Sequence, residues 1–266
     1  MNHKQQEQKM SNRAYWIAFY TILTKEIYRF VRIWPQTLLP PLITTILYFL
    51  IFGKVIGDRV GAMDGVTYAQ FIAPGLIMMT VISNSYSNVV SSFFSAKYSH
   101  HIEEMLVAPV PNIVIIAGYV MGGVARGLAV GGIVTIVALF FIDMKIDNIL
   151  LMLLIFLLTS LVFSLAGLIN AIFARSFDDI SIIPTFILTP LTYLGGVFYS
   201  VSLLPEFWQN ISYFNPVLYM VSAFRYSILG VSDINIFTAI TLLLGFFIVL
   251  FSVAYYLLHK GTGLKS

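Results

Sequence analysis

The 266-residue chain contains no cysteine and little charge. Without cysteine, disulfide bonds, thiolate catalysis and thiolate metal sites are excluded. Charged residues make up 10% of the sequence, whereas soluble domains carry about 25%. This is too little charge to cover a water-facing surface, and hydrophobic residues reach 59%. The composition therefore predicts a membrane protein.

Signals for nucleotide binding and for processing are also missing. The phosphate-binding pattern G-x-x-x-x-G-K-[ST] does not occur, because the terminal GTGLKS has Leu264 where the pattern requires glycine. The polar N-terminal segment MNHKQQEQKMSN lacks the apolar core of a cleavable signal peptide. We therefore expect insertion to rely on the first apolar block, and no nucleotide to be bound by this chain.

Six apolar blocks are long enough to cross a bilayer, for which a helix needs about 20 residues. They cover 35–55, 68–94, 112–142, 149–173, 182–199 and 236–258. The apolar stretch 216–230 offers only ~14 residues before Gly230, which is typical of a re-entrant or interfacial helix. The sequence thus predicts an all-α membrane protein with six transmembrane helices over 35–259, an N-terminal cytoplasmic segment 1–34 and a cytoplasmic tail 260–266.

The basic residues predict the orientation, since cytoplasmic loops carry an excess of Lys and Arg. With six spans, more of them fall on the side of the two termini than on the other side. The first side would hold Lys4, Lys9, Arg13, Lys25, Arg29, Arg32, Lys97, Arg175, Lys260 and Lys265, and the second Lys54, Arg59, Lys145 and Arg225. We therefore expect both termini in the cytoplasm. A seventh span would move Lys260 and Lys265 outside.

Two segments outside the spans are predicted to be helical. In 13–32, Lys25, Arg29 and Arg32 share one face and aromatic and aliphatic residues fill most of the rest, which suits either the anionic cytoplasmic leaflet or packing against the spans. In 96–111, a helix of about three turns should end at Pro109 and Pro111. This helix would expose an acidic pair beside an apolar flank, either as a rigid contact for a partner or as a solvated turn; the residues are Ile102, Glu103, Glu104, Met105, Leu106 and Val107.

The third span combines many glycines with one charge. Its small-xxx-small spacing lets another helix approach closely, either within the subunit or across a dimer, and the glycines are Gly118, Gly122, Gly123, Gly127, Gly131 and Gly132. Arg126 would be costly at the bilayer centre. We expect it to extend to the cytoplasmic boundary; substrate binding or an internal ion pair are the alternatives.

Uncharged polar faces occur on the second and fifth spans. They could line a pathway for an amphipathic solute or hold helices together by hydrogen bonds, and their residues are Asn84, Ser87, Asn88, Ser91, Thr185, Thr189, Thr192 and Tyr193. Pro190 should kink the fifth span. Beyond it, Glu206, Arg225 and Asp233 are expected at the aqueous rim in solvated positions, and Asp178 and Asp179 should cap the start of the fifth span.

Residues 173–226 read FARSFDDISIIPTFILTPLTYLGGVFYSVSLLPEFWQNISYFNPVLYMVSAFRY. This order of charged turn, proline-broken span, paired glycines, aromatic bend and Asn215-Pro216 step resembles the late part of ABC-2 type transporter permeases. The likeness continues through IEEMLVAPVP at 102–111 and to the C-terminus. It implies an ABC-2 fold in which 102–106 couples to an ATPase and 13–32 is the connecting helix. The lack of an internal repeat favours a homodimer, and the resemblance adds two copies of a separate ABC ATPase that bind ATP and Mg²⁺, with transport directed outward.

Other functions fit the sequence less well. An ion-coupled secondary transporter, the main alternative, usually keeps ionisable groups near the midplane, where only Arg126 is a candidate. An intramembrane enzyme would need a buried catalytic pair, but His3, His100, His101 and His259 lie outside the apolar blocks or at their edges. Adjacent histidines point about 100° apart on a helix, so no metal site is expected. We expect no catalytic residue, no cofactor bound by this chain and no nucleic-acid partner, but contact with membrane lipids.

Overall fold

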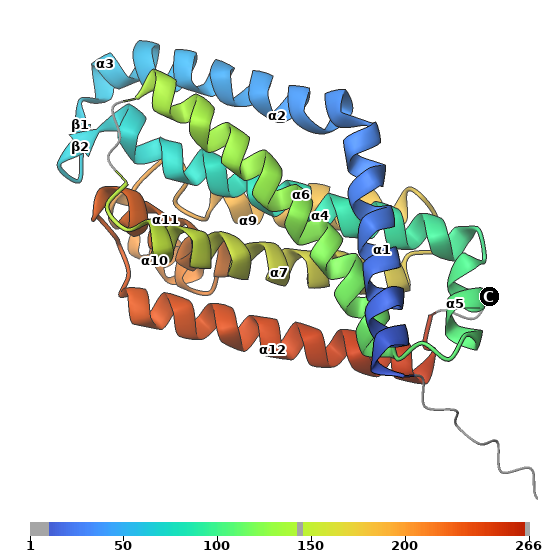
Figure 1. The fold of residues 1–266 in the computed structure, drawn as a ribbon. Coiled ribbons are helices and arrows are strands. Elements are labelled where there is room, and N and C mark those ends of the chain that lie inside the picture. Colours follow the sequence, from blue (N-terminus) through green and yellow to red (C-terminus); the bar gives the residue numbers. More distant parts are fainter. Residues whose placement is uncertain (1–10, 143–145, 264–266) are drawn as a thin grey trace, which may run out of the picture.

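The computed structural model describes residues 11–142 and 146–263. It is almost entirely helical, with one short hairpin (Figure 1). The helices are α1 (Asn12–Arg32), α2 (Trp34–Tyr48), η1 (Phe49–Ile56), α3 (Gly57–Val60), α4 (Tyr68–Tyr98), α5 (His101–Val107), α6 (Asn112–Phe141), α7 (Ile149–Phe173), α8 (Asp179–Ile183), η2 (Pro184–Leu188), α9 (Thr189–Tyr193), η3 (Val201–Leu203), α10 (Glu206–Tyr213), α11 (Pro216–Leu229) and α12 (Ile236–Lys260). The antiparallel strands are β1 (Ala62–Met63) and β2 (Val66–Thr67).

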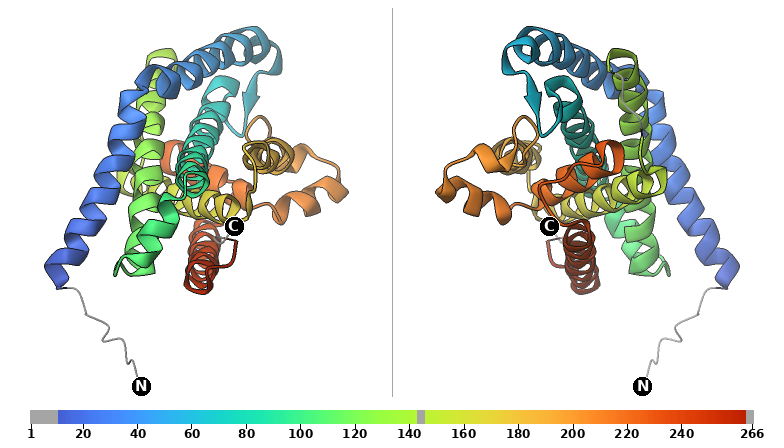
Figure 2. Two further views of the ribbon diagram at one scale, coloured as in Figure 1. Left: turned by 90° about the vertical axis from the view of Figure 1, so that its right-hand side faces the viewer. Right: turned by 90° about the vertical axis from the view of Figure 1, so that its left-hand side faces the viewer.

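The long helices run between two ends of an elongated bundle, and α1 crosses α2, α7 and α12 steeply and α6 more obliquely (Figure 1). The hairpin, α10 and α11 lie towards one end, and α5 and the end of α12 lie at the other. On the side opposite α1 and α2, α10 projects away from the bundle (Figure 2). This arrangement separates two polar ends by a long apolar middle.

Local sequence signals explain where several helices begin and end. Thr67 and Gln70 form a capping box at the start of α4, in which each side chain bonds the other's backbone amide. Asn148 caps α7 and Asn235 caps α12 by accepting from amides of the first turn. Gly261, with φ of +66°, ends α12 in the left-handed conformation that glycine adopts at little cost.

The predicted spans agree with the helices to different degrees. Within the described residues, four helices are long and apolar enough to cross a membrane: Trp34–Gly53, Asn112–Phe141, Ile149–Phe173 and Ile236–Lys260. The 31-residue α4 is not among them, and its inner half carries many Ser and Asn residues. The fifth predicted block is helical only over α8, η2 and α9, because the chain turns at Gly195 and Gly196. Its helical part therefore ends at Tyr193 and not at Tyr199.

The core lies where α4, α6 and α7 pack together, and the glycines of α6 set their distance. A methyl group added at Gly118 would lie 2.5 Å from Ile22 of α1, and one at Gly122 would lie 2.5 Å from Cβ of Glu26. On a neighbouring face of α6, Gly123, Gly127 and Gly131 face side chains of α4 and α7. Close approach of this kind gives membrane helices their van der Waals contact. These five glycines therefore pack inside one subunit, whereas Gly132 faces open space.

The helix predicted over 96–111 is wrong in its extent. The chain remains in α4 up to Tyr98, turns at Ser99 and His100, and then forms the seven-residue α5. His100 has φ of +59°, a left-handed conformation that few residues other than glycine adopt. The corner separates α4 from α5, so that α5 has about two turns in place of the predicted three.

Candidate functional site

The polar face predicted on α4 divides between two environments. Arg126 of α6 donates from Nε to Oδ1 of Asn84 at 3.2 Å. Arg29 of α1 donates to the carbonyl oxygen of Asn88 at 2.6 Å, to its Oδ1 at 2.8 Å and to Oγ of Ser91 at 3.2 Å. Asn84, Asn88 and Ser91 therefore join α4 to its neighbouring helices.

Ser87 lies in the second environment, between α4 and the segment of η2 and α9. There a cavity of about 80 Å³ is lined by Ser87 together with Met79, Ser83, Tyr86, Pro184, Leu188, Thr189 and Thr192. Thr185 is exposed outside this cavity, and Tyr193 stacks on Phe198 with ring centres 5.7 Å apart. Of the eight predicted pathway residues, the structure thus brings Ser87, Thr189 and Thr192 together.

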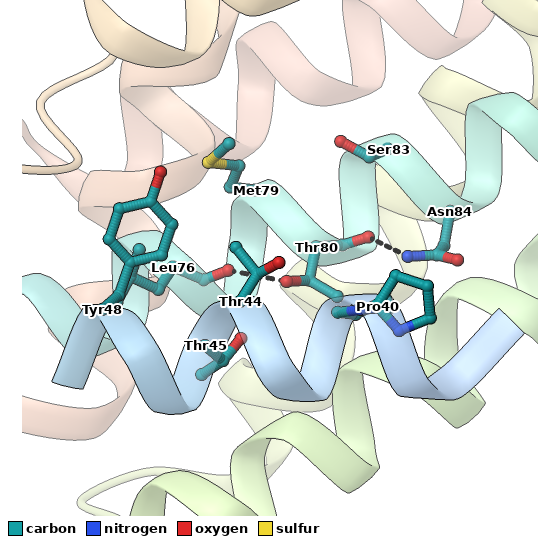
Figure 3. Close-up of a pocket in the computed structure, with 10 residues that line it drawn as sticks. Pro40, Thr44, Thr45, Tyr48, Leu76, Met79, Thr80, Ser83 and Asn84 are labelled. Carbon is teal, nitrogen blue, oxygen red and sulfur yellow. Dashed lines mark hydrogen bonds between the residues drawn. The ribbon is translucent and has the colours of Figure 1, made fainter. Parts of the chain in front are cut away.

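A second hollow lies on the other side of α4, against α2 (Figure 3). Its volume is about 190 Å³, and its walls are Pro40, Pro41, Thr44, Thr45, Tyr48, Leu76, Met79, Thr80, Ser83 and Asn84. Thr80, Ser83 and Asn84 contribute polar groups from α4, Thr44 and Thr45 contribute hydroxyls from α2, and the remaining walls are mostly apolar. Met79 and Ser83 line both hollows, so the two hollows lie at the same level of α4.

The N-terminal helix is anchored by a carboxylate that sequence analysis did not single out. Glu26 is fully buried, accepts from Ser92 Oγ at 2.6 Å, and lies 3.5 Å from Arg29 Nε and 3.7 Å from Lys25 Nζ. A buried carboxylate needs both charge pairing and hydrogen bonds to offset its lost hydration. The only sequence signal was one acidic residue inside a basic and aromatic helix.

This anchoring decides how α1 is oriented. Arg29 points to α4 and Lys25 to Tyr119 of α6, so the helix packs against the protein's own helices, one of the two predicted possibilities. Trp16, Tyr20 and Tyr28 form its exposed side. Within the basic stripe, the guanidinium of Arg29 turns towards the bundle and bonds to Asn88 and Ser91, while its side chain stays partly exposed.

Arg225 was expected at the aqueous rim, and this is wrong. It is 1% exposed, and its guanidinium lies 3.8 Å from the centre of the Phe71 ring. It donates to the carbonyl oxygens of Gly196 at 2.6 Å and Phe71 at 3.3 Å, and it pairs with Asp233 at 3.3 Å. Asp233 also accepts from Ser200 at 2.9 Å. Its partners come from three separate parts of the chain, which residue spacing could not reveal.

The predicted coupling residues occupy α5. Ile102 is 2% exposed and anchors the helix, and Met105 and Leu106 pack partly against the core. Glu103 and Glu104 remain exposed, and His100 Nδ1 lies 3.2 Å from Oε1 of Glu103. Within the described part of the chain, no group of three or more metal-ligating side chains is present. The helix therefore shows a carboxylate surface while its apolar side fixes it to the bundle.

A groove of about 920 Å³ lies beside α5. It is lined by Phe94, Lys97, Tyr98, His100, Glu103, Phe173, Ala174, Arg175, Thr262 and Gly263. Lys97 Nζ donates to the carbonyl oxygens of Ile172 at 2.6 Å and Ala174 at 2.8 Å, which ties the end of α4 to the end of α7. Burial and the nearby Arg175 lower the pKa of Lys97. These contacts hold two long helices together at this end of the bundle.

Asp179 closes the turn before α8. Its Oδ2 accepts from the amides of Arg175 at 2.8 Å and Ser176 at 3.1 Å, while Ser176 Oγ accepts from the amide of Asp179 at 3.2 Å. The exchange between Ser176 and Asp179 is that of a capping box. The predicted capping role therefore belongs to Asp179, and Asp178 makes no side-chain cap bond.

Comparison with known proteins agrees with this architecture. Residues 17–229 match the family described as ABC-2 type transporter. The chain is 56% identical over 252 residues to the inner membrane transport permease YadH of Escherichia coli K12, covering 95% of this chain and 98% of that protein. It is 26% identical over 216 residues to nodulation protein J of Rhizobium leguminosarum bv. viciae, covering 81% and 83%. The chain therefore belongs to the ABC-2 type transporter family and is a multi-pass permease subunit of the inner membrane.

Proposed function

We propose that the chain works as a homodimer that forms the translocation pathway of an exporter, driven by two copies of a separate ABC ATPase. The observation that carries the proposal is α5, a short helix fixed by Ile102 that exposes Glu103 and Glu104. Two exposed carboxylates on a helix that is packed against the bundle can pair with basic groups of a partner without the loss of force that a flexible loop would cause. ATP and Mg²⁺ would be held by that partner.

The proposed topology has six spans with both termini in the cytoplasm. In support, α2 with η1, α4, α6, α7, α8 to α9, and α12 run alternately between the two ends of the bundle (Figure 1). Lys97, Arg175 and Thr262 line one groove, so the end of α4, the loop after α7 and the turn after α12 share one side. The positive-inside rule makes this side cytoplasmic. Residues 1–10, 143–145 and 264–266, which hold Lys4, Lys9, Lys145 and Lys265, lie outside the described part.

A second copy would cover the segment Asp179–Tyr193. Neither α8 nor η2 buries a single residue, and Thr185 and Thr189 are exposed beside Phe186 and Ile187. The Thr189 hydroxyl already donates to the carbonyl oxygen of Pro184 at 2.9 Å, and the hydroxyl of Thr185 can bond to another helix or to a solute. We therefore assign this segment, with the hollows on either side of α4, to the dimer interface and the pathway. Their walls combine apolar side chains with uncharged hydroxyl and amide groups, which favours an amphipathic cargo.

Co-purification tests the proposal directly. The tagged full chain is isolated from its native membrane, and any ATPase that accompanies it is identified. Reversing both charges in Glu103→Lys with Glu104→Lys should reduce the recovered ATPase or uncouple ATP hydrolysis. The matched control is Glu206→Lys, an exposed acidic residue near the other end of the bundle.

The results separate the alternatives. Loss of ATPase with the double variant and retention with the control would support coupling through α5. Full association and unchanged coupling in the double variant would contradict it. Transport by the purified chain alone, driven by a proton or sodium gradient, would favour the secondary-transporter alternative.

A further inference from the structure

The crossing of α1 over α4 and α6 concentrates positive charge. We call this group the crossing cluster and define it as Lys25, Glu26, Arg29, Asn84, Asn88, Tyr119 and Arg126. Lys25 and Arg29 both lie within 4 Å of Glu26, and Arg126 bonds to Asn84 one helical turn from Asn88. With three cations and one carboxylate, the cluster carries two excess positive charges.

Glu26 does not neutralise this excess. Its Oε1 is engaged with Ser92, and its two charge partners are Lys25 and Arg29. Arg126 has only the neutral amide of Asn84 as a hydrogen-bond partner among the described residues, and Arg29 is close enough to repel it. A guanidinium carries five N–H donors, so Arg126 retains donors for a further acceptor. A buried cation without a charge partner, such as Arg126, is costly unless an anion joins it.

The cluster can be reached from the membrane. The side chains of Lys25 and Arg29 are 52% and 30% exposed, although they bond inward. The same helix exposes Trp16, Tyr20 and Tyr28, and aromatic side chains of this kind favour the headgroup level of a bilayer. Since α1 crosses α2, α7 and α12 steeply, it lies near the membrane plane when those helices span the bilayer (Figure 1).

We propose that the crossing cluster binds the phosphate of an anionic lipid headgroup. Arginine forms paired N–H bonds to phosphate oxygens, and Arg29 and Arg126 would provide them while Lys25 adds a mobile positive charge. The acyl chains would lie along the exposed aromatic side of α1. The inference depends on the membrane location of the chain and not on an ATPase partner.

Lipid binding to the purified full chain is the test, read by native mass spectrometry with phosphatidylglycerol, phosphatidylcholine and inorganic phosphate. Phosphatidylglycerol should bind at least about fivefold more tightly than the uncharged phosphatidylcholine, because one basic residue near an anionic surface contributes about that factor. Arg29→Gln and Arg126→Gln should each remove most of the preference, and Arg126→Lys should restore part of it. If inorganic phosphate displaces phosphatidylglycerol, a phosphate group alone is sufficient for binding to the cluster. If it does not, binding requires the lipid, as proposed.

Arg32→Gln is the matched control, because Arg32 is exposed on the same helix outside the cluster. Glu26→Gln should strengthen phosphatidylglycerol binding, since it removes the competing negative charge; a purely structural role of the cluster does not predict this gain. Size-exclusion profiles identify variants that fold. Equal binding of the two lipids, or an equal loss in Arg32→Gln and Arg29→Gln, would overturn the proposal.

Discussion

Arg225 and Gly196 are joined by a 2.6 Å hydrogen bond from the guanidinium Nη2 to the carbonyl oxygen. Gly196 follows α9 in a left-handed turn, and Arg225 lies inside α11, so the bond links the end of one helical segment to the interior of another. Phe71 of α4 provides both a ring face and a carbonyl acceptor for the same side chain. One buried arginine thus holds α4, α9 and α11 together.

We expect Arg225→Gln to destabilise the protein more than any exposed arginine substitution. Removing one member of a buried pair leaves Asp233 without its cation, which typically costs about 3–5 kcal/mol. Thermal unfolding of the detergent-purified chain measures the effect. Arg59→Gln, an exposed arginine at the same end, is the control and should leave the midpoint nearly unchanged. Equal midpoints for the two variants would show that the buried contacts contribute little.

Two glycines of α6 should respond oppositely to alanine. Gly122→Ala places a methyl group 2.5 Å from Glu26 of α1 and should cost about 1–3 kcal/mol through overpacking. Gly132→Ala meets open space and should be neutral or slightly stabilising, since alanine favours helix more than glycine. Unfolding midpoints of both variants provide the comparison. The packing described for α1 and α6 would be wrong if Gly122→Ala were as stable as Gly132→Ala.

The turn at Asp179 should depend on pH. Hydrogen bonds from the Arg175 amide and from Ser176 lower the pKa of this carboxyl below its ordinary value of 3.8. Because the pKa of Asp179 is lower in the folded state, its carboxylate stabilises the fold fully at pH values above 3.8. This stabilisation is lost as the pH falls through the lowered pKa of the folded state. Amide hydrogen exchange of Arg175 and Ser176 should therefore lose protection on acidification.

Asp179→Asn should produce the same loss of protection at neutral pH, whereas Asp178→Asn, whose carboxylate makes no cap bond, should not. Protection that stayed constant in Asp179→Asn would show that the side chain does not hold the turn.

The orientation can be tested by thiol labelling, because the natural chain has no cysteine. Val107→Cys lies on α5 at a position that is 88% exposed, and Asn210→Cys lies on the exposed surface of α10. In intact cells whose outer membrane is permeabilised, a membrane-impermeant thiol reagent should label position 210 and not position 107. Inverted inner-membrane vesicles should give the opposite result, and labelling of 107 in the intact cells would reverse the proposed topology.

Helices that are defined by local signals could be predicted from the sequence. The block 149–173 coincides with α7, and 112–142 exceeds α6 by one residue, because long apolar runs there end at residues that favour turns. The length of α11 was also predicted from Pro216 and Gly230, which begin and end it. In contrast, the corner at His100 depends on a left-handed conformation that the sequence AKYSHHIEE does not demand.

The buried charges could not be predicted, because their partners are distant in the sequence. Glu26 is bonded to Ser92, and Arg225 to the carbonyl of Phe71, across 66 and 154 residues. A pattern of spacing identifies faces of one helix but not the helix that covers them. For the same reason, the polar face of α4 was predicted as one stripe. In the structure, Asn88 and Ser91 bond to Arg29, whereas Ser87 lines the cavity near α9.

The bonds from Lys97 to the last carbonyls of α7 have a mechanical consequence. Only Ser99 and His100 separate α4 from α5, so a displacement of α5 would reach Lys97 within one helical turn. Since the same ammonium group holds Ile172 and Ala174, the end of α7 would have to follow. A torque applied to the seven residues of α5 would then turn α4 and α7 as a single body. The serine-lined side of α4 would tilt with them.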